Sequence, residues 1–355
     1  MVGLWLAKTG EANAWYHIYP FALSRNLDSL HVIRYKKPLR NIPNVEYHIY
    51  NSAGLILDVL KMFFKGVNVV KKEKVDFLIT FNPVPWGTIA WLVAKLTKRP
   101  LVLGFIGTDF NYYLRKSIFK SFLKKVITSS DIITIPGSHM LAYLLSIGVE
   151  KERIFIYPHG VPNEWQDNQN LSFDQKEYDI ISIGDLTENK NIIHILKAIK
   201  VLKDENIKVN YCIVGDGPER DRINNFVNEN DLIDRVYVLG YKNNVKPFLE
   251  KSKIYVQASL NEGLSLGLIE AMSLGVVPIV TLAGSEKDYI QHGINGLIYS
   301  LIDVNQLVKE IKFAINPVNY VKMKNNLLKS REKYSIDNTI KVVDKILIKL
   351  KNQSK

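Results

Sequence analysis

Short apolar runs alternate with longer amphipathic segments along nearly the whole chain. The apolar runs predict buried strands, because strands inside a parallel sheet are apolar on both faces. The segments between them, such as 55–64 and 88–97, space their apolar residues three and four positions apart, which predicts helices. The sequence therefore predicts an α/β fold built from alternating strands and helices. The runs that we assign to strands are 2–7, 29–36, 75–82, 99–107, 131–135, 179–184, 208–215, 235–241, 253–259 and 276–280.

Length and composition indicate two domains. At 355 residues the chain exceeds the usual size of a single hydrophobic core, and 47% apolar residues are enough to fill two cores. The stretch Asn163–Asp174 is polar and aperiodic, so we place the connection between the domains there. We expect a first domain over 1–165, a second over 175–318, and a segment of lysine-rich helices over 319–355.

Charge is distributed unevenly along the chain. The net charge is +12, to which residues 1–165 contribute +10, residues 166–308 contribute −6 and residues 309–355 contribute +8. This asymmetry predicts a polyanionic neighbour for the surface that the two ends build; anionic lipid, a phosphorylated acceptor and nucleic acid are the alternatives. Charge that serves solubility alone is the other interpretation.

The cysteine content and the apolar runs indicate a cytoplasmic protein. The single cysteine, Cys212, excludes an intrachain disulfide, and its place in the run YCIV is typical of a core position. The first residues lack the basic segment of a secretory signal. No apolar run reaches the roughly 18 residues that a spanning helix needs.

The stretch Asn261–Gly275, NEGLSLGLIEAMSLG, predicts a ligand loop that opens a helix. Gly263 and Gly267 let a ligand approach the backbone, because they carry no Cβ. Ser265 is a candidate N-cap for a helix from about Leu266 to Leu274. The first N–H groups of that helix, together with the positive end of its dipole, favour a phosphate.

Two carboxylates, Glu262 and Glu270, stand eight positions apart in this stretch. Glu262 comes before the predicted helix, and Glu270 lies one turn inside it. A second anion beside a phosphate would be repelled, so Glu270 suits an uncharged partner such as vicinal hydroxyls. A nucleotide sugar offers both phosphates and hydroxyls.

The stretch resembles the Glu-x7-Glu motif of retaining glycosyltransferases of family 4, which have the two-lobed GT-B fold. The strings GDGPE at 215–219 and NGL at 295–297 are similar to strings of that family as well. The resemblance spans nearly the whole chain and is densest from Gly184 to Leu297. It implies two Rossmann-like lobes that face a central cleft, with the last helix crossing back to the first lobe.

The resemblance also implies roles for individual residues. Lys190 and the helix after Ser265 would stabilise the leaving diphosphate. Glu262 would orient the sugar, Glu270 would bind the ribose, and the loop after the strand 235–241 would hold the base. The catalytic candidates are Glu262, Lys190 and Asp109; the donor-binding candidates are Gly10, Gly184, Lys190, Tyr241, Lys242, Gly263, Leu264, Ser265, Leu266 and Glu270.

One departure from the family's pattern lies in the first domain. Many members have a histidine before Gly-Thr-Asp that reaches the donor sugar, where this chain has Ile106. Two interpretations of Asp109 follow: it takes over that hydrogen bond, or it is a helix cap or turn former.

A second departure lies in the loop after the strand 179–184. The family's arginine in this loop is replaced by Asp185, while its lysine is kept at 190. A carboxylate close to a diphosphate costs roughly 1 to 4 kcal/mol at intermediate dielectric. We therefore expect Asp185 to point away from the donor, with Lys8 or Arg220 supplying the missing charge.

The segment Tyr112–Ile127 predicts a basic amphipathic helix, with one apolar stripe and with Lys116, Lys120 and Lys124 at every fourth position. Either its stripe packs into the first domain, or the helix lies on an anionic bilayer. Each lysine near such a surface adds about 1 kcal/mol. The second alternative suits a lipid-linked acceptor.

Taken together, these features predict a cytoplasmic retaining enzyme that moves a hexose from a nucleotide-diphosphate sugar to a glycan or lipid-linked acceptor; the alternative left open by the basic helix is that it works at the inner face of a membrane. We find no Asp-x-Asp pair, so no metal is expected, and no cofactor beyond the nucleotide sugar. Another GT-B enzyme, a sugar-nucleotide epimerase or a phosphorylase, is the alternative. A nucleic-acid-binding protein is disfavoured, because the basic charge does not interleave with a recognised module.

Overall fold

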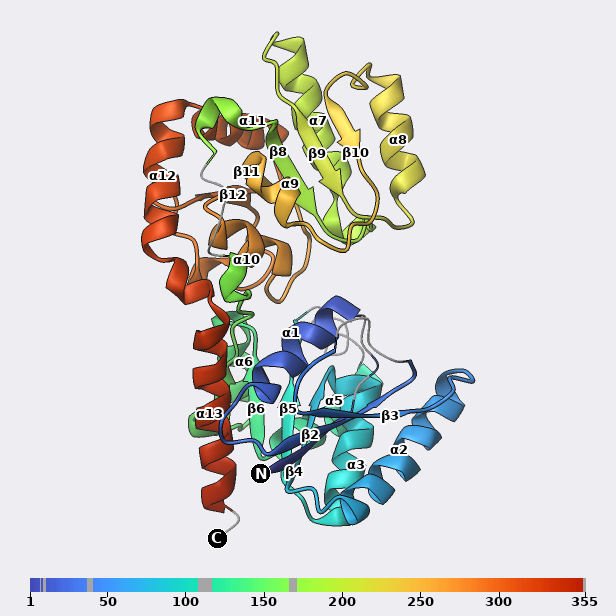
Figure 1. Cartoon of the computed structure of the whole chain (residues 1–355). Helices are drawn as coiled ribbons and strands as arrows, with labels where there is room; N and C mark the ends of the chain where they lie inside the picture. The colour runs from blue at the N-terminus through green and yellow to red at the C-terminus, as the bar shows by residue number, and fades with distance from the viewer. Residues whose placement is uncertain (7, 9–10, 37–40, 108–116, 166–170, 354–355) are drawn as a thin grey trace. The chain divides into compact units, whose positions relative to one another are not determined.

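A computed structural model describes residues 1–6, 8, 11–36, 41–107, 117–165 and 171–353. The chain forms two compact units (Figure 1). The first comprises Met1–Gly160 together with Ile336–Lys355, and the second comprises Val161–Ser335. Each unit has its own parallel sheet and hydrophobic core.

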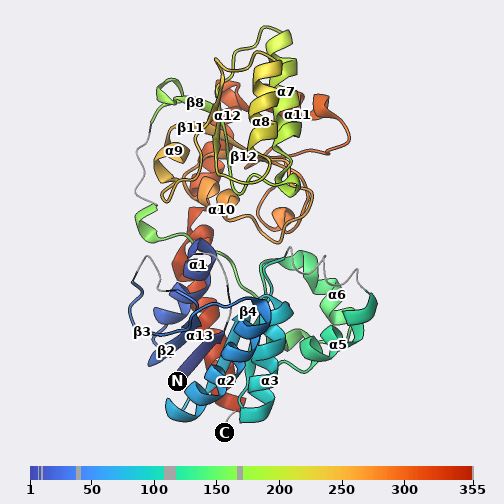
Figure 2. The same cartoon turned by 90° about the vertical axis from the view of Figure 1, so that its right-hand side faces the viewer.

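The first unit is built on a seven-stranded parallel sheet in the order β3-β2-β1-β4-β5-β6-β7. Its central strands are buried along almost their whole length, as expected for a parallel sheet with helices on both faces (Figure 2). The strands are β1 Val2–Leu6, β2 Ser29–Arg34, β3 Val45–Ile49, β4 Phe77–Phe81, β5 Leu101–Gly104, β6 Ile132–Ile135 and β7 Ile154–Ile156.

The helices of this unit include the last helix of the chain. Four apolar side chains of α13, from Val343 to Leu350, belong to the same core as β1 and β4. The helix also contacts α1 and β7. The helices are α1 Glu11–Ala22, α2 Leu55–Lys72, α3 Thr88–Thr97, α5 Ser117–Thr128, α6 Leu141–Ser146 and α13 Ile336–Gln353.

The second unit is built on a six-stranded parallel sheet in the order β10-β9-β8-β11-β12-β13. Cys212 lies in its core, as predicted. The strands are β8 Tyr178–Ile183, β9 Tyr211–Val214, β10 Val236–Val238, β11 Ser252–Gln257, β12 Val277–Val280 and β13 Leu297–Ile298. The helices are α7 Ile192–Asp204, α8 Arg220–Glu229, α9 Lys246–Glu250, α10 Leu266–Ser273, α11 Val304–Ala314 and α12 Pro317–Lys329.

Both sheets are doubly wound and have the topological switch point of the Rossmann fold. The strand order reverses between β1 and β4 in the first sheet and between β8 and β11 in the second. At such a point the connections leave in opposite directions and open a crevice at the carboxyl ends of the strands, where open α/β sheets bind ligands. The predicted α/β class is therefore confirmed in both units.

The units begin and end at other residues than the sequence predicted. The first boundary falls between Gly160 and Val161, before the polar stretch 163–174. Helix α12 belongs to the second unit, so the return to the first unit begins at Ile336 rather than at residue 319. Helix α12 is part of the second unit because Tyr320, Met323 and Leu327 pack into the core of that unit.

Helix α5 packs into the first unit, as one of the two alternatives for 112–127 proposed. Leu123, Val126 and Ile127 are buried in a small core with β5, β6 and α6, while Lys120 and Lys124 are exposed. Residues 112–116 of that segment lie outside the described residues. Among the helices that the structure describes, none is long and apolar enough to cross a bilayer.

Candidate active site

At the switch point of the second unit, an ion pair joins the loops that follow β8 and β11. Lys190 Nζ binds Glu262 Oε1, and the side chains of the two residues are 23% and 8% exposed. Two hydrogen bonds join the same loops: Leu260 N donates to Asn189 O (2.9 Å), and Asn189 Nδ2 donates to Asn261 O (2.8 Å). The pair therefore sits at the crevice where this topology places ligands.

Glycines bring three neighbouring loops into direct backbone contact at this end of the sheet. Gly184 N donates to Val214 O (3.1 Å), and Gly215 N donates to Gly240 O (3.0 Å). Gly215 has a φ of +154°, and a Cβ built on it would lie 1.9 Å from Gly184 O. The loops after β8, β9 and β10 thus form one packed backbone surface beside Lys190.

Helix α10 begins at the switch point, directly after the loop that carries Glu262. The structure confirms the predicted helix, with Ser265 at the N-cap position. The Ser265 hydroxyl does not cap the helix, however; it lies 3.3 Å from the Tyr255 hydroxyl. Gly267 allows the close approach of this turn, because a Cβ there would lie 3.3 Å from the Cβ of Ile183 at the end of β8. The N–H groups of the first turn have no partner within the helix, which makes its N-terminus a suitable place for an anion.

Three carboxylates gather around the buried Tyr255. Burial above all, and then the charges of Glu262, Glu270 and Glu286, raises the pKa of the Tyr255 hydroxyl. Glu270 is partly buried in the second turn of α10. The two predicted glutamates therefore lie in one electrostatic environment.

Glu286 is a site residue that sequence reasoning missed. Its side chain is fully buried and accepts hydrogen bonds from Gly284 N (2.6 Å) and Gln257 Nε2 (3.0 Å). Burial raises the pKa of this carboxyl group. The loop that it holds is hydrogen-bonded to the Glu262 loop, through Glu262 N to Ala283 O (2.9 Å). The signal was present in the sequence, since Gly-Ser-Glu follows the strand 276–280 as Glu262 follows β11.

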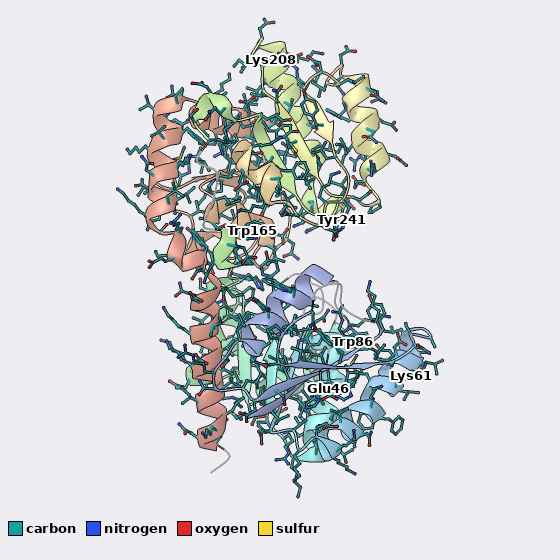
Figure 3. The ribbon with its side chains drawn as sticks, in the orientation of Figure 1. Glu46, Lys61, Trp86, Trp165, Lys208 and Tyr241 are labelled. Carbon is teal, nitrogen blue, oxygen red and sulfur yellow. The ribbon has the colours of Figure 1, made fainter. Side chains whose placement is uncertain are left out.

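The loop after β10 lies at the side of the site where the base was expected. Tyr241 is 63% exposed, and Figure 3 shows it at the edge of the second unit. Lys242 is exposed next to it. Arg220 lies close to the backbone of Gly240, since its Nη1 would be 3.4 Å from a Cβ added to that glycine. The same nitrogen forms an ion pair with Asp216 Oδ2 at 2.5 Å. A stackable ring and a cation are therefore adjacent here.

Comparison with known proteins agrees with this geometry. The profile of the family described as "Glycosyltransferase Family 4" matches residues 18–165, and that of "Glycosyl transferases group 1" matches residues 163–334. A Campylobacter jejuni alpha-1,4-N-acetyl-D-galactosaminyltransferase, whose name gives a diphosphoundecaprenol-linked glycan as its substrate, is 31% identical over 279 residues, which are 76% of this chain and 74% of that protein. The chain belongs to glycosyltransferase family 4.

Other family 4 relatives and solved structures support the fold. An Escherichia coli UDP-Gal:alpha-D-GlcNAc-diphosphoundecaprenol alpha-1,3-galactosyltransferase is 24% identical over 83% of this chain and 80% of its own length. HepE from Anabaena, in complex with UDP and glucose, superposes with a TM-score of 0.81 at 15% identity, covering 98% of this chain and all of HepE. Sucrose-phosphate synthase from Thermosynechococcus elongatus gives 0.82 at 16% identity, with 99% of each chain covered. These likenesses establish the GT-B fold for this glycosyltransferase.

The structure describes all but two of the residues predicted from the family pattern. The structure brings Gly184, Lys190, Glu262 and Glu270 together in the second unit, with the loop residues 263–266. Gly10 and Asp109, both expected in the first domain, lie outside the described residues.

The two cations considered as substitutes for the family's arginine both have acidic partners. Lys8 Nζ binds Asp58 Oδ2 (2.9 Å) in the first unit, and Arg220 binds Asp216. Asp185 is exposed, where water screens its charge. The orientation expected for Asp185 relative to the donor stays a prediction.

Proposed function

We propose that this glycosyltransferase transfers a hexose, with retention, from a nucleotide-diphosphate sugar to a lipid-linked glycan. The observation that carries the proposal is the Lys190–Glu262 ion pair at the switch point, directly before the N-terminus of α10. Without donor, each member of this pair neutralises the other. A diphosphate would compete with Glu262 for Lys190, and Glu262 would then turn to the hydroxyls of the sugar.

The chemistry of the step follows from these groups. Negative charge develops on the diphosphate as the glycosidic bond breaks, and Lys190 with the N–H groups of α10 stabilises it. Glu262 orients the sugar or its developing oxocarbenium ion, and Glu270 accepts hydrogen bonds from the ribose hydroxyls. Positive charge from the protein thus takes the place that a metal holds in other glycosyltransferases, so transfer should survive chelation of divalent metals with EDTA.

The donor is best assigned to the UDP class. The E. coli relative uses UDP-Gal by name, and HepE has been crystallised with UDP and with UDP-glucose. Thermal-shift measurements with UDP, GDP and ADP sugars test this assignment. A higher Tm with GDP or ADP sugars than with every UDP sugar would overturn it.

Retention at the anomeric carbon rests on family membership and on the products of the relatives. The names of the C. jejuni and E. coli enzymes specify α-linked products. Transfer from an α-linked donor to an α-linked product is retention. The anomeric proton coupling of the product, measured by NMR, distinguishes the two stereochemical outcomes.

Two substitutions test the assignment of the site. Lys190→Ala removes the cation for the leaving group, and Glu270→Ala removes the ribose contact; both should abolish transfer while the protein stays folded. Lys200→Ala is the matched control, because Lys200 is an exposed lysine of α7 that pairs with Asp204. Wild-type turnover by either site variant would refute the proposed function.

We further propose that the enzyme works at an anionic membrane surface, with the outer face of α2 as the contact. Five large apolar side chains of this helix are exposed: Leu55 (61%), Ile56 (77%), Leu57 (50%), Leu60 (48%) and Phe64 (66%). The helix buries Asp58 together with Met62, Gly66, Val69 and Val70, and it turns Lys61 outward (Figure 3). Such an exposed apolar face is unfavourable in water. Each of these side chains that enters a bilayer stabilises the membrane-bound protein by roughly 1 to 2 kcal/mol.

Charge points to an anionic bilayer as the occupant of this face. The first unit carries a net charge of +14, whereas the second carries −2. Exposed Lys61, Lys71 and Lys72 lie along the same helix as the apolar residues. An acceptor with a diphosphoundecaprenol anchor, as in the names of the two relatives, would be presented at such a surface.

Vesicle sedimentation tests the membrane contact. The wild type should bind vesicles that contain phosphatidylglycerol and should bind phosphatidylcholine alone much more weakly. Ile56→Ser/Leu60→Ser/Phe64→Ser should weaken binding at least tenfold. Ile302→Ser/Val318→Ser, which changes residues of the second unit that are 96% and 77% exposed, should leave binding unchanged. Unchanged binding by the α2 variant, or an α2-dependent dimer without vesicle binding, would overturn this part of the proposal.

A further inference from the structure

Two histidines and a glutamate meet on the edge of the first sheet. His31 lies on β2, and Glu46 and His48 lie on β3. His31 Nδ1 is 3.0 Å from His48 Nε2 and 3.7 Å from Glu46 Oε2, and His48 Nε2 is 3.8 Å from Glu46 Oε1. The three residues each offer a ligand atom within 4.8 Å of the others.

The sheet itself fixes this triangle. Glu46 and His48 are two residues apart on one strand, so their side chains leave the same face of the sheet. The parallel register pairs His31 with Glu46 and Ile33 with His48, which puts His31 beside both residues of β3. No flexible loop is needed to bring the three side chains together.

We propose that His31, Glu46 and His48 bind one divalent transition-metal ion of the zinc type. Tetrahedral Zn²⁺ with bonds of about 2.0 to 2.1 Å to nitrogen and oxygen sets its ligand atoms roughly 3.3 Å apart. The two histidine nitrogens are 3.0 Å apart, and each lies 3.7 or 3.8 Å from one of the two carboxylate oxygens of Glu46, so a small rotation of the exposed Glu46 side chain would bring one oxygen to this spacing from both nitrogens. Two imidazoles and one carboxylate form a known zinc ligand set, in which water takes the fourth position.

Burial and the surrounding charges are compatible with a bound cation. The His31 and His48 side chains are 5% and 16% exposed, whereas Glu46 is 61% exposed, so an ion enters from the side of Glu46. The two neighbouring lysines of α2 are engaged elsewhere, Lys65 with Ile49 O (2.8 Å) and Lys72 with Glu73 (3.0 Å).

The ion would cross-link β3 to β2, because its ligands come from both strands. Among the strands that the structure describes, β3 is the last on its side of the sheet and pairs only with β2. A metal shared by both strands would fix their register and hold the edge. The role is structural and independent of the proposed transfer reaction, whose charges lie in the second unit.

Zinc binding is measured on the full-length chain without a histidine tag, after removal of metals with EDTA. Titration against a chromophoric zinc chelator should give one Zn²⁺ per chain, and Co²⁺ should give the intense visible bands of a four-coordinate ion. Zn²⁺ should also raise the Tm, because it binds the folded state.

Three variants locate the site. Glu46→Gln should weaken zinc binding at least tenfold, and His48→Gln should abolish it. His292→Gln, which changes an exposed histidine of the second unit, should bind zinc like the wild type. Glu46 is exposed, so Glu46→Gln should keep the metal-free Tm and thereby exclude misfolding as the cause.

The proposal fails if the wild type binds zinc no more tightly than His48→Gln, or if Glu46→Gln and His48→Gln both keep wild-type affinity. Transfer activity in EDTA is a separate measurement. Its loss would contradict the metal-independent transfer proposed above and would leave the zinc titration to decide this site.

Discussion

The two switch points of this molecule carry the same kind of ion pair in different settings. In the first unit Lys8, just after β1, binds Asp58; in the second Lys190, after β8, binds Glu262. Asp58 is fully buried on a helix and also accepts hydrogen bonds from Ser52 Oγ (2.6 Å) and Ala53 N (2.9 Å). Ser52 foremost, with Lys8 and Ala53, holds the pKa of Asp58 at about 2, against the opposing effect of burial.

The difference separates a structural ion pair from one that we propose to be exchangeable. Asp58 is bound by a cation, a hydroxyl and a backbone N–H, so a ligand that took Lys8 away would leave a buried charge behind. Glu262 stands on a loop next to a helix N-terminus and close-packed glycine backbone. A nucleotide sugar whose diphosphate binds Lys190 would also supply hydroxyl groups that can donate hydrogen bonds to Glu262. Among the residues that the structure describes, the second switch point therefore has the composition that we propose for the donor site.

The largest effect is expected from the exchangeable pair. Lys190→Met should lower transfer by roughly a thousandfold, because the charge that stabilises the leaving group is lost. It should also lower stability, by about 3 kcal/mol if the pair behaves as a buried one, since Glu262 is left without its cation. Turnover and urea unfolding of the same preparation measure the two effects.

The double variant Lys190→Met/Glu262→Gln distinguishes catalysis from stability. It removes both charges, so most of the stability should return while transfer stays lost. Recovery of transfer together with stability would mean that the pair is structural, as at Lys8 and Asp58.

The glycines of the second switch point give the next largest effect. Gly215→Ala should destabilise the protein by about 3 kcal/mol, because its Cβ would collide with the backbone at Gly184 O and its φ is +154°. Gly184→Ala brings its Cβ only to within 3.2 Å of Lys190 Cε, the end of a flexible side chain. The φ of +144° would still strain the backbone of the alanine. The added Cβ should mainly displace the Lys190 side chain and thereby raise KM for the donor.

Thermal unfolding and donor kinetics of the two alanine variants separate these outcomes. The expectation is a lower Tm for Gly215→Ala than for Gly184→Ala. Equal losses of Tm would show that φ strain, and not the backbone contact, decides the cost at both positions.

Acid should destabilise the first unit, through two histidines that it buries. Burial lowers the pKa of His159 to about 4, and burial followed by His159 lowers that of His17 well below its usual value. The unfolded chain takes up these protons near pH 6.5 and the folded chain does not. Stability is therefore complete above about pH 6.5 and falls as the pH drops towards 4, by roughly 3 kcal/mol for His159 alone.

Unfolding by urea at pH 7 and pH 5 measures this loss. His159→Gln should reduce the difference between the two pH values, whereas His292→Gln, in the second unit, should not. An unchanged pH dependence in His159→Gln would show that other groups cause the acid sensitivity.

The sequence predicted the second switch point well, because its chemistry is local. Glu262, the turn at Ser265 and helix α10 follow one another within a single stretch, so spacing alone fixed their relation. Lys190 is 72 residues away from Glu262. The family pattern assigned Lys190 to the diphosphate and Glu262 to the sugar but did not predict their ion pair, which the pairing of β8 with β11 explains. Glu286 was missed because its role is to brace another loop.

The first unit was predicted less completely, because its features depend on tertiary contacts. The strand β3 (VEYHI) is only partly buried and charged at Glu46, so it lacks the apolar run that marked most of the other strands. The apolar residues of α2 suggested a core face, and Met62, Val69 and Val70 do pack into the core, but the helix also buries Asp58 and exposes Ile56 and Phe64. Neither the partner of Asp58 nor the edge of the sheet is visible in local spacing.

The smallest effect is expected at Asp185, where the family's arginine is replaced. Asp185→Asn should tighten donor binding by only about twofold, because the side chain is exposed and its repulsion of a diphosphate is screened by water and salt. Asp231→Asn makes the same charge change at an exposed site beyond the C-terminus of α8, before β10, and should leave affinity unchanged. Isothermal titration with a UDP sugar at low and high salt measures both. A gain of tenfold or more would mean that Asp185 faces the donor directly and that this switch point binds the diphosphate against its repulsion.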